Sequence, residues 1–144
     1  MQYEKFTNLL IKEVTPALGC TAPISVAIAA ARCREELTAP PQKIQVILDP
    51  GIYKNGWGIS IPGTTEKGNS LGAALGIIAG KASLGLNVLN DVTSIDIEKA
   101  IDLVNTGVVS VECDRNKNKI YISVTVQSNN EKVHTLIEDT HTNW

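Results

Sequence analysis

The chain has 144 residues, of which 43% are hydrophobic and 19% charged, and its formal net charge is −2. This length suits one domain with its own core, residues 1–144, and the near-neutral charge argues against a nucleic-acid partner, which usually requires a basic patch. The longest apolar run, near 71–79, is shorter than the roughly 20 residues of a membrane span, so no membrane partner is expected. Three cysteines without paired spacing do not indicate a disulfide framework, so we expect a cytoplasmic location.

The first third of the chain predicts two helices, near 2–14 and 22–37. In the first, apolar residues recur at helical spacing, and Pro16 follows the pattern. The second has Thr21 as its expected N-cap. It is apolar nearly all round, which predicts that it is largely buried.

A strand is predicted near 43–48, followed by a glycine-rich loop from Gly51 to Gly68. Loops longer than about 12 residues are uncommon in compact domains and are usually functional. A buried helix near 69–83 comes next. It carries Gly72, Gly76 and Gly80 on one face, and this spacing of small residues predicts close packing against another helix.

The last third predicts an amphipathic helix near 94–106 and three strands. Gly107 is the natural stop of the helix. The strands are expected near 108–113, 119–127 and 131–138, and their turn-rich connections predict a meander of two hairpins. The expected fold class is therefore α+β, with a largely antiparallel sheet of about four strands covered by helices.

Cys20 lies in the most constrained turn of the chain, within Gly19-Cys-Thr-Ala-Pro23, directly before an apolar helix. The positive end of a helix dipole favours a thiolate, which suits a metal ligand or a nucleophile; a buried structural cysteine is the alternative. Cys33 and Cys113 are expected to be structural. The cysteine spacing does not support a zinc or iron–sulfur site from this chain alone, so further ligands would have to come from elsewhere.

Three other positions are candidates for chemistry. The segment from Gly63 to Ser70 nearly matches a phosphate-binding loop, but Asn69 stands where the lysine belongs. The alternative is a nest of backbone N–H groups near a helix start, able to hold a carboxylate. Lys54 could contact a substrate carboxylate or act as a base, or it could be a solvated loop lysine. His141 could titrate at the mouth of a site or simply be exposed.

Several motifs occur together along the chain: Glu13-Val-Thr-Pro-Ala-Leu-Gly-Cys-Thr-Ala-Pro23, Tyr53-Lys-Asn55, Ile61-Pro-Gly-Thr64, Ala73-Ala-Leu-Gly76 with Ala79-Gly80, Leu86-x-Val-Leu89 and His141-Thr-Asn143. In this combination the chain resembles the N-terminal part of the L-cysteine desulfidase family, grouped with the iron–sulfur-dependent L-serine dehydratase α-subunits. The resemblance covers nearly all 144 residues.

The resemblance implies a lyase that eliminates sulfide from L-cysteine, or water from L-serine, and yields pyruvate and ammonia. It implies a [4Fe–4S] cluster in the complete enzyme, with Cys20 as one ligand and one iron acting as a Lewis acid. It makes Lys54 and His141 the catalytic candidates. The substrate contacts that it implies are Asn55, Thr64 and Asn143.

Two departures from the family pattern shape the expected partners. Ala22 stands where the family usually has Glu, and the family chain continues past His141-Thr-Asn143 into a part that holds its other cluster cysteines. We therefore expect a C-terminal half or partner subunit, and an isolated chain that is inactive and binds no cluster. The alternative is a non-catalytic amino-acid-binding or oligomerisation module. A homo-oligomer is also expected, because apolar helices near 23–37 and 69–83 would be exposed in a shortened chain.

Overall fold

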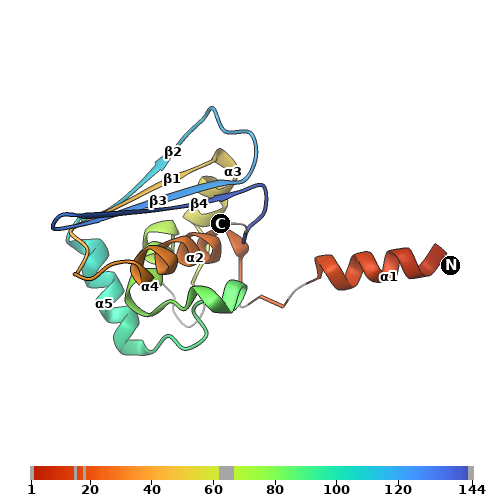
Figure 1. The fold of residues 1–144 in the computed structure, drawn as a ribbon, viewed down its shortest axis with the longest axis horizontal. Coiled ribbons are helices and arrows are strands. Elements are labelled where there is room, and N and C mark those ends of the chain that lie inside the picture. The colour runs from red at the N-terminus through yellow and green to blue at the C-terminus, as the bar shows by residue number, and fades with distance from the viewer. Residues whose placement is uncertain (1, 15, 18, 62–66, 143–144) are drawn as a thin grey trace.

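The chain folds around a four-stranded sheet, as seen in a computed structural model that describes residues 2–14, 16–17, 19–61 and 67–142 (Figure 1). The strands lie in the order β2-β1-β3-β4, with β1 parallel to β2 and the other pairs antiparallel. This open sheet with its helices confirms the predicted α+β class. The strands are β1 (Lys43–Leu48), β2 (Val109–Cys113), β3 (Tyr121–Ser128) and β4 (Glu131–Glu138).

The helices pack on one face of the sheet, apart from α1, which projects from the body (Figure 1). They are α1 (Gln2–Glu13), α2 (Thr21–Glu35), α3 (Pro50–Trp57), α4 (Asn69–Ala79) and α5 (Ser94–Asn105), with a 3₁₀ helix, η1 (Ala82–Asn87), after α4. The predicted helices near 2–14, 22–37, 69–83 and 94–106 are confirmed with small shifts. The third of these ends at Ala79, because Gly80 is extended (φ −63°, ψ 144°) and the chain continues as η1.

The start of α2 differs by one residue from the prediction. Cys20 is the N-cap, with extended backbone (φ −61°, ψ 128°), and its side chain makes no capping hydrogen bond. Thr21 is instead the first helical residue, and its carbonyl oxygen accepts a hydrogen bond from Ser25 Oγ at 2.7 Å. The expectation that Thr21 is the cap was therefore wrong.

The predicted meander of two hairpins was also wrong in its first half. β2 does not pair with β3; it pairs in parallel with β1, from Ile44 opposite Val109 to Leu48 opposite Cys113. β1 therefore separates β2 from β3. A parallel pair requires a long crossover, which here runs through α3, α4, η1 and α5. Only the second hairpin, β3 with β4, is formed as expected.

The predicted loop from Gly51 to Gly68 begins as a helix, α3. Asp49 caps it: one carboxylate oxygen, Oδ1, accepts from the backbone N–H groups of Gly51 (2.8 Å) and Ile52 (3.1 Å), and Pro50 occupies the first helical position. The other oxygen, Oδ2, accepts from the N–H of Tyr121 at 2.9 Å. One buried carboxylate thus joins the end of β1, the start of α3 and the start of β3.

The backbones of α2 and α4 pack closely against each other. A Cβ atom at Gly76 would lie 2.3 Å from the carbonyl oxygen of Ala27, and one at Gly72 would lie 2.7 Å from that of Pro23. These distances leave no room for a side chain, so the two helix backbones are in direct contact. The predicted close approach at the spaced glycines is confirmed.

The two glycine- and alanine-rich helices are buried rather than exposed. Residues 22–31 of α2 are all buried between α4 and the sheet, and α4 is buried over most of its length. The expectation that they would be exposed in a shortened chain was wrong, because each covers the other and the sheet covers α2. These two helices therefore cannot supply the interface of the expected homo-oligomer, which would have to form through another surface.

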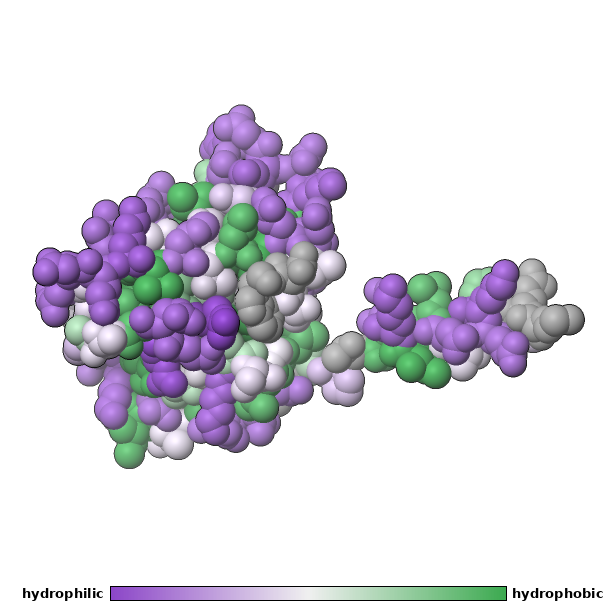
Figure 2. Space-filling model, in the orientation of Figure 1, coloured by the Kyte–Doolittle hydropathy of each residue, from purple (hydrophilic) through white to green (hydrophobic). Residues whose placement is uncertain are grey.

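The helix that does lack cover is α1. Its apolar side chains are exposed along the projecting helix (Figure 2), among them Phe6 at 60% and Leu10 at 61%. Among the described residues, no helix has the length and apolar character needed to cross a bilayer.

Replacing Gly76 by Ala tests the contact between α2 and α4. Alanine favours a helix by about 1 kcal/mol, but the new methyl group would overlap the Ala27 carbonyl, and overpacking costs about 1–3 kcal/mol. Because the overlap is with backbone, we expect the upper end of that cost and hence a net loss of about 2 kcal/mol in the free energy of unfolding, measured by urea denaturation. Gly58→Ala is the matched control, since a Cβ there meets nothing within 4 Å, and it should change stability by less than about 0.5 kcal/mol. An unchanged midpoint for Gly76→Ala would contradict the direct backbone contact.

Candidate functional site

A hollow of about 350 Å³ opens where α3, the start of α4 and the edge strand β2 meet. Its volume falls at the lower end of small-molecule sites. The side chains and backbone that line it come from three distant segments: Tyr53, Trp57, Lys67, Gly68, Asn69, Ser70, Val109 and Val111.

One end of the hollow is formed by the N-terminus of α4. The N-cap is Gly68, with φ +104°, and it has no side chain to cap the helix. Intrahelical bonding begins with the N–H of Gly72, which donates to the Gly68 carbonyl at 3.2 Å. The N–H groups of Asn69, Ser70 and Leu71 precede that bond and lie at the positive end of the helix dipole. Such an end attracts a carboxylate or phosphate group.

Among the described residues that line the hollow, the charge has one sign. Lys67 is the only charged side chain in that described lining, and the α4 N-terminus adds partial positive charge. The remaining walls are aromatic or aliphatic: the Tyr53 and Trp57 rings lie 5.9 Å apart between centroids, and Val109 and Val111 come from β2. The arrangement can bind a small molecule that has one negatively charged group and an otherwise uncharged, partly apolar structure.

Asn69 fixes the position of α4 against α3. Its side chain is 5% exposed, and Nδ2 donates to the carbonyl oxygens of Ile52 (3.3 Å) and Tyr53 (3.4 Å). Its Oδ1 is buried and has no hydrogen-bond partner among the described residues. Oδ1 lies against Gly56, where a Cβ would be only 1.8 Å away. Gly56 is therefore needed for Asn69 to reach α3, and this contact shapes the hollow.

The structure does not bring the described site residues that were predicted, Lys54, Asn55, Cys20 and His141, into the lining of the hollow at the start of α4. Lys54 and Asn55 lie on exposed faces of α3, whereas Tyr53 and Trp57 of the same helix line the hollow. The cause is the helix itself, which turns successive residues by 100° onto different faces. Thr64 and Asn143 lie outside the described residues, so the roles predicted for them stay predictions.

Cys20 and His141 lie at the same end of the body. His141 is half-buried and lines a shallow hollow with Thr21 and Leu86, and Cys20 directly precedes Thr21 as the N-cap of α2. Within the described part of the chain, neither Cys20 nor His141 lines the hollow at the start of α4. The catalytic and cofactor roles predicted for them stay predictions.

The described residues do not fit an iron–sulfur cluster by themselves. A cluster needs three or four cysteine ligands, and no group of three or more His, Cys, Asp or Glu side chains in the described ranges could hold a metal ion. Cys33 lies 13 residues after Cys20, about 20 Å along the axis of α2, and it faces the sheet. We therefore derive no chemical step through a cluster for this chain.

Sequence reasoning found part of the hollow and missed the rest. The segment ending in Gly68, Asn69 and Ser70 was identified as a possible carboxylate-binding nest. Trp57, Val109 and Val111 were missed, because nothing in their local sequence shows that β2 and α3 meet the start of α4. The signal that could have found α3 was Asp49-Pro50, a typical N-cap followed by proline at the first helical position.

The chain is similar to proteins named UPF0597. It is 42% identical over 137 residues to one from Photobacterium profundum, and the match covers 95% of this chain and 32% of that relative. It is 39% identical over 135 residues to one from Parabacteroides distasonis (94% and 31%), and 38% identical over 136 residues to one from Clostridium tetani (94% and 32%). The chain thus spans about a third of the length of these relatives. No protein-family model and no solved structure gave a significant match.

These relatives overturn the expected resemblance to the L-cysteine desulfidase and L-serine dehydratase family. They are named UPF0597 proteins, and no family model links the chain to either enzyme. The structure gives a physical reason for caution with the motifs. Ala73-Ala-Leu-Gly76 and Ala79-Gly80 are explained by the tight packing of α4 on α2, which requires small residues whatever the chemistry.

The three thiols are expected to differ in reactivity. Burial raises the pKa of Cys33, whose Sγ also lies 3.3 Å from Thr135 Oγ1, whereas Cys20 and Cys113 are half-buried. Iodoacetamide at neutral pH should label Cys20 and Cys113 at least about tenfold faster than Cys33, as measured by mass spectrometry of peptides. In urea the three rates should converge.

The same thiol predicts a dependence of stability on pH. In the unfolded chain Cys33 ionises near its ordinary pKa, about 9, while the folded chain keeps it protonated. Below that pH the thiol is protonated in both states and costs the folded state nothing. As the pH rises above it, ionisation favours the unfolded chain and lowers the free energy of unfolding. The melting temperature should therefore fall more steeply above about pH 9 in the natural chain than in Cys33→Ala. Cys113→Ala is the control, and equal slopes for all three proteins would contradict the burial of Cys33.

Proposed function

We propose that the hollow at the start of α4 binds the carboxylate of a small molecule of amino-acid size. The observation that carries the proposal is the uncapped N-terminus of α4 beside Lys67, in a hollow without an acidic side chain among its described lining residues. Backbone N–H groups and a lysine together provide charge-assisted hydrogen bonds to a carboxylate. The positive end is fixed in place by Asn69, so it is organised before the ligand arrives.

The remaining walls suit the uncharged part of such a ligand. Tyr53, Trp57 and the two β2 valines offer apolar surface opposite the polar end of the hollow. A volume of about 350 Å³ accommodates a small amino acid together with water. The absence of further positive side chains in the described lining also favours a single carboxylate over a polyphosphate.

We propose that, in a protein of the length of these relatives, this hollow holds the substrate of a lyase that eliminates sulfide or water from a small amino acid. The carboxylate contact would orient the substrate, and the base and the group that activates the leaving atom would come from elsewhere in that protein. A non-catalytic amino-acid-binding module is the alternative. The three free thiols support a cytoplasmic location for either.

Titration with L-serine and with L-serinamide, followed by protein NMR, tests the carboxylate site. L-Serine should shift the backbone amide signals of Asn69, Ser70 and Leu71, while L-serinamide, which lacks the carboxylate, should not. Lys67→Gln should weaken the binding of L-serine about tenfold, the loss expected for one charge-assisted hydrogen bond.

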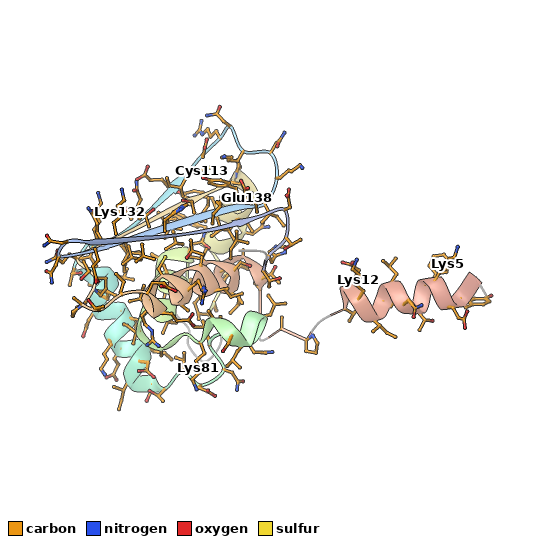
Figure 3. All side chains as sticks on the ribbon, viewed as in Figure 1. Lys5, Lys12, Lys81, Cys113, Lys132 and Glu138 are labelled. Carbon is orange, nitrogen blue, oxygen red and sulfur yellow. The ribbon has the colours of Figure 1, made fainter. Side chains whose placement is uncertain are left out.

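Lys5→Gln is the matched control, because Lys5 is exposed on α1, away from the body (Figure 3). It should leave the affinity for L-serine unchanged. Equal binding of L-serine and L-serinamide, or an unchanged affinity in Lys67→Gln, would rule out the carboxylate site. Formation of pyruvate from L-cysteine or L-serine by a full-length relative then separates the lyase from the binding module.

A further inference from the structure

The strand β4 forms one edge of the sheet, and its outer side is open. It is eight residues long and contains no proline, and β3 is the only strand that pairs with it among the described residues. Natural proteins usually protect such edges with proline, bulges or a covering element, because unpaired backbone groups invite another strand. An open edge of this length is therefore a candidate surface for strand addition.

The alternation of the backbone shows which groups face outward. Asp139 N–H donates to the Ile120 carbonyl (3.2 Å), so Asp139 is hydrogen-bonded toward β3. In an antiparallel pair, every second residue along the strand is bonded to the neighbouring strand in this way. Odd-numbered residues of β4 therefore bond to β3. The N–H and C=O groups of the even-numbered residues point away from it: Lys132, His134, Leu136 and Glu138.

There is room for a strand beside this edge. A hollow of about 420 Å³ runs between β4 and α2, lined by Arg32, Glu36 and residues 133–136. Arg32 and Glu36 are exposed and of opposite charge, and Arg32 also pairs with Glu35 in its own helix at 2.7 Å. The edge is thus bordered by space and by charges of both signs.

We propose that the occupant of this edge is the β4 strand of a second copy, paired antiparallel about a two-fold axis at Thr135. In this register, Lys132 lies opposite Glu138 of the second copy and Glu138 lies opposite Lys132, so each dimer has two pairs of opposite charge. These two residues lie toward opposite ends of β4 (Figure 3). Two-fold symmetry requires such self-complementarity, in which each residue of a pair meets the other.

The alternation of the backbone supports this register. Lys132 and Glu138 are both residues whose backbone faces outward, so the pairing forms backbone hydrogen bonds as well as charge pairs. A shift to the next hydrogen-bonded register places Lys132 opposite Leu136, or Glu138 opposite His134, and loses the charge pairing. Opposite charges directly across two strands are stabilising, and like charges are destabilising.

Glu131 and Asp139, the acidic residues that flank this pairing, make contacts within their own chain. Glu131 accepts hydrogen bonds from Thr38 through both carboxylate oxygens, at 3.0 Å from N–H and 2.7 Å from Oγ1. Asp139 lies 3.4 Å from Lys119 Nζ. Their repulsion across the two-fold axis is therefore reduced.

The dimer follows from the β4 edge and does not depend on the proposed ligand. Sedimentation velocity should show, with rising concentration, a species of twice the 15.4 kDa chain mass. Hydrogen exchange should then slow at the amides of Lys132, His134, Leu136 and Glu138 in the dimer relative to the dilute monomer. A strict monomer, or a dimer in which these four amides exchange at the monomer rate, would overturn the proposal.

Charge exchange tests the register. Lys132→Glu and Glu138→Lys should each weaken the dimer about tenfold, because each creates two like-charge pairs across the axis. The double variant should restore the affinity, since the two residues are six apart on one strand and can meet only between copies. Lys5→Glu on α1 is the matched control and should leave the dimer intact. A failure of the double variant to recover, with each variant folded by circular dichroism, would show that another surface forms the dimer.

Discussion

The contact between α2 and α4 depends on small residues along both helices, and most of the structure is arranged around it. Gly72 and Gly76 bring the backbone of α4 against Pro23 and Ala27 of α2. With α4 on one side and the sheet on the other, α2 has no solvent face over residues 22–31. This explains why a helix with so little amphipathic character is stable, and why the core uses alanine, valine and isoleucine with hardly any aromatic side chains.

The position of the candidate site follows from that contact. Once α4 is fixed on α2, its N-terminus reaches the place where α3 and β2 meet, and Asn69 binds the carbonyl groups of α3. Asp49 holds α3 at the end of β1 and ties β3 to the same point. Two of the three elements around the hollow, α3 and α4, are therefore fixed by buried polar contacts, which favours a site that is organised before its ligand binds.

The order of the strands separates the two proposed surfaces. The hollow lies against β2, at one edge of the sheet, and the proposed dimer forms at β4, on the opposite edge. A ligand and a second copy would therefore not compete for space. The apolar side chains of α1 are the other exposed feature, and they contribute to neither surface in the described residues.

The sequence by itself determined the elements whose signals are local. The helical spacing of apolar residues, the spaced glycines and Gly107 identified four of the helices and the close approach of α4, and turn residues located all four strands. Asp49-Pro50 was ambiguous, because the same residues end a strand and start a helix. The nest at Gly68 to Ser70 was visible because its residues are adjacent in the chain.

Only the tertiary structure decided which elements meet. The parallel pairing of β2 with β1 follows from a crossover of about 60 residues, and no local pattern specifies the partner of a strand. The same is true of the hollow, whose walls come from residues near 53, 67 and 110. It also holds for α1, whose apolar spacing is that of a packed helix although no described element covers it. Which elements pack together depends on many contacts between residues far apart in the chain, and a local sequence pattern carries no information about those contacts.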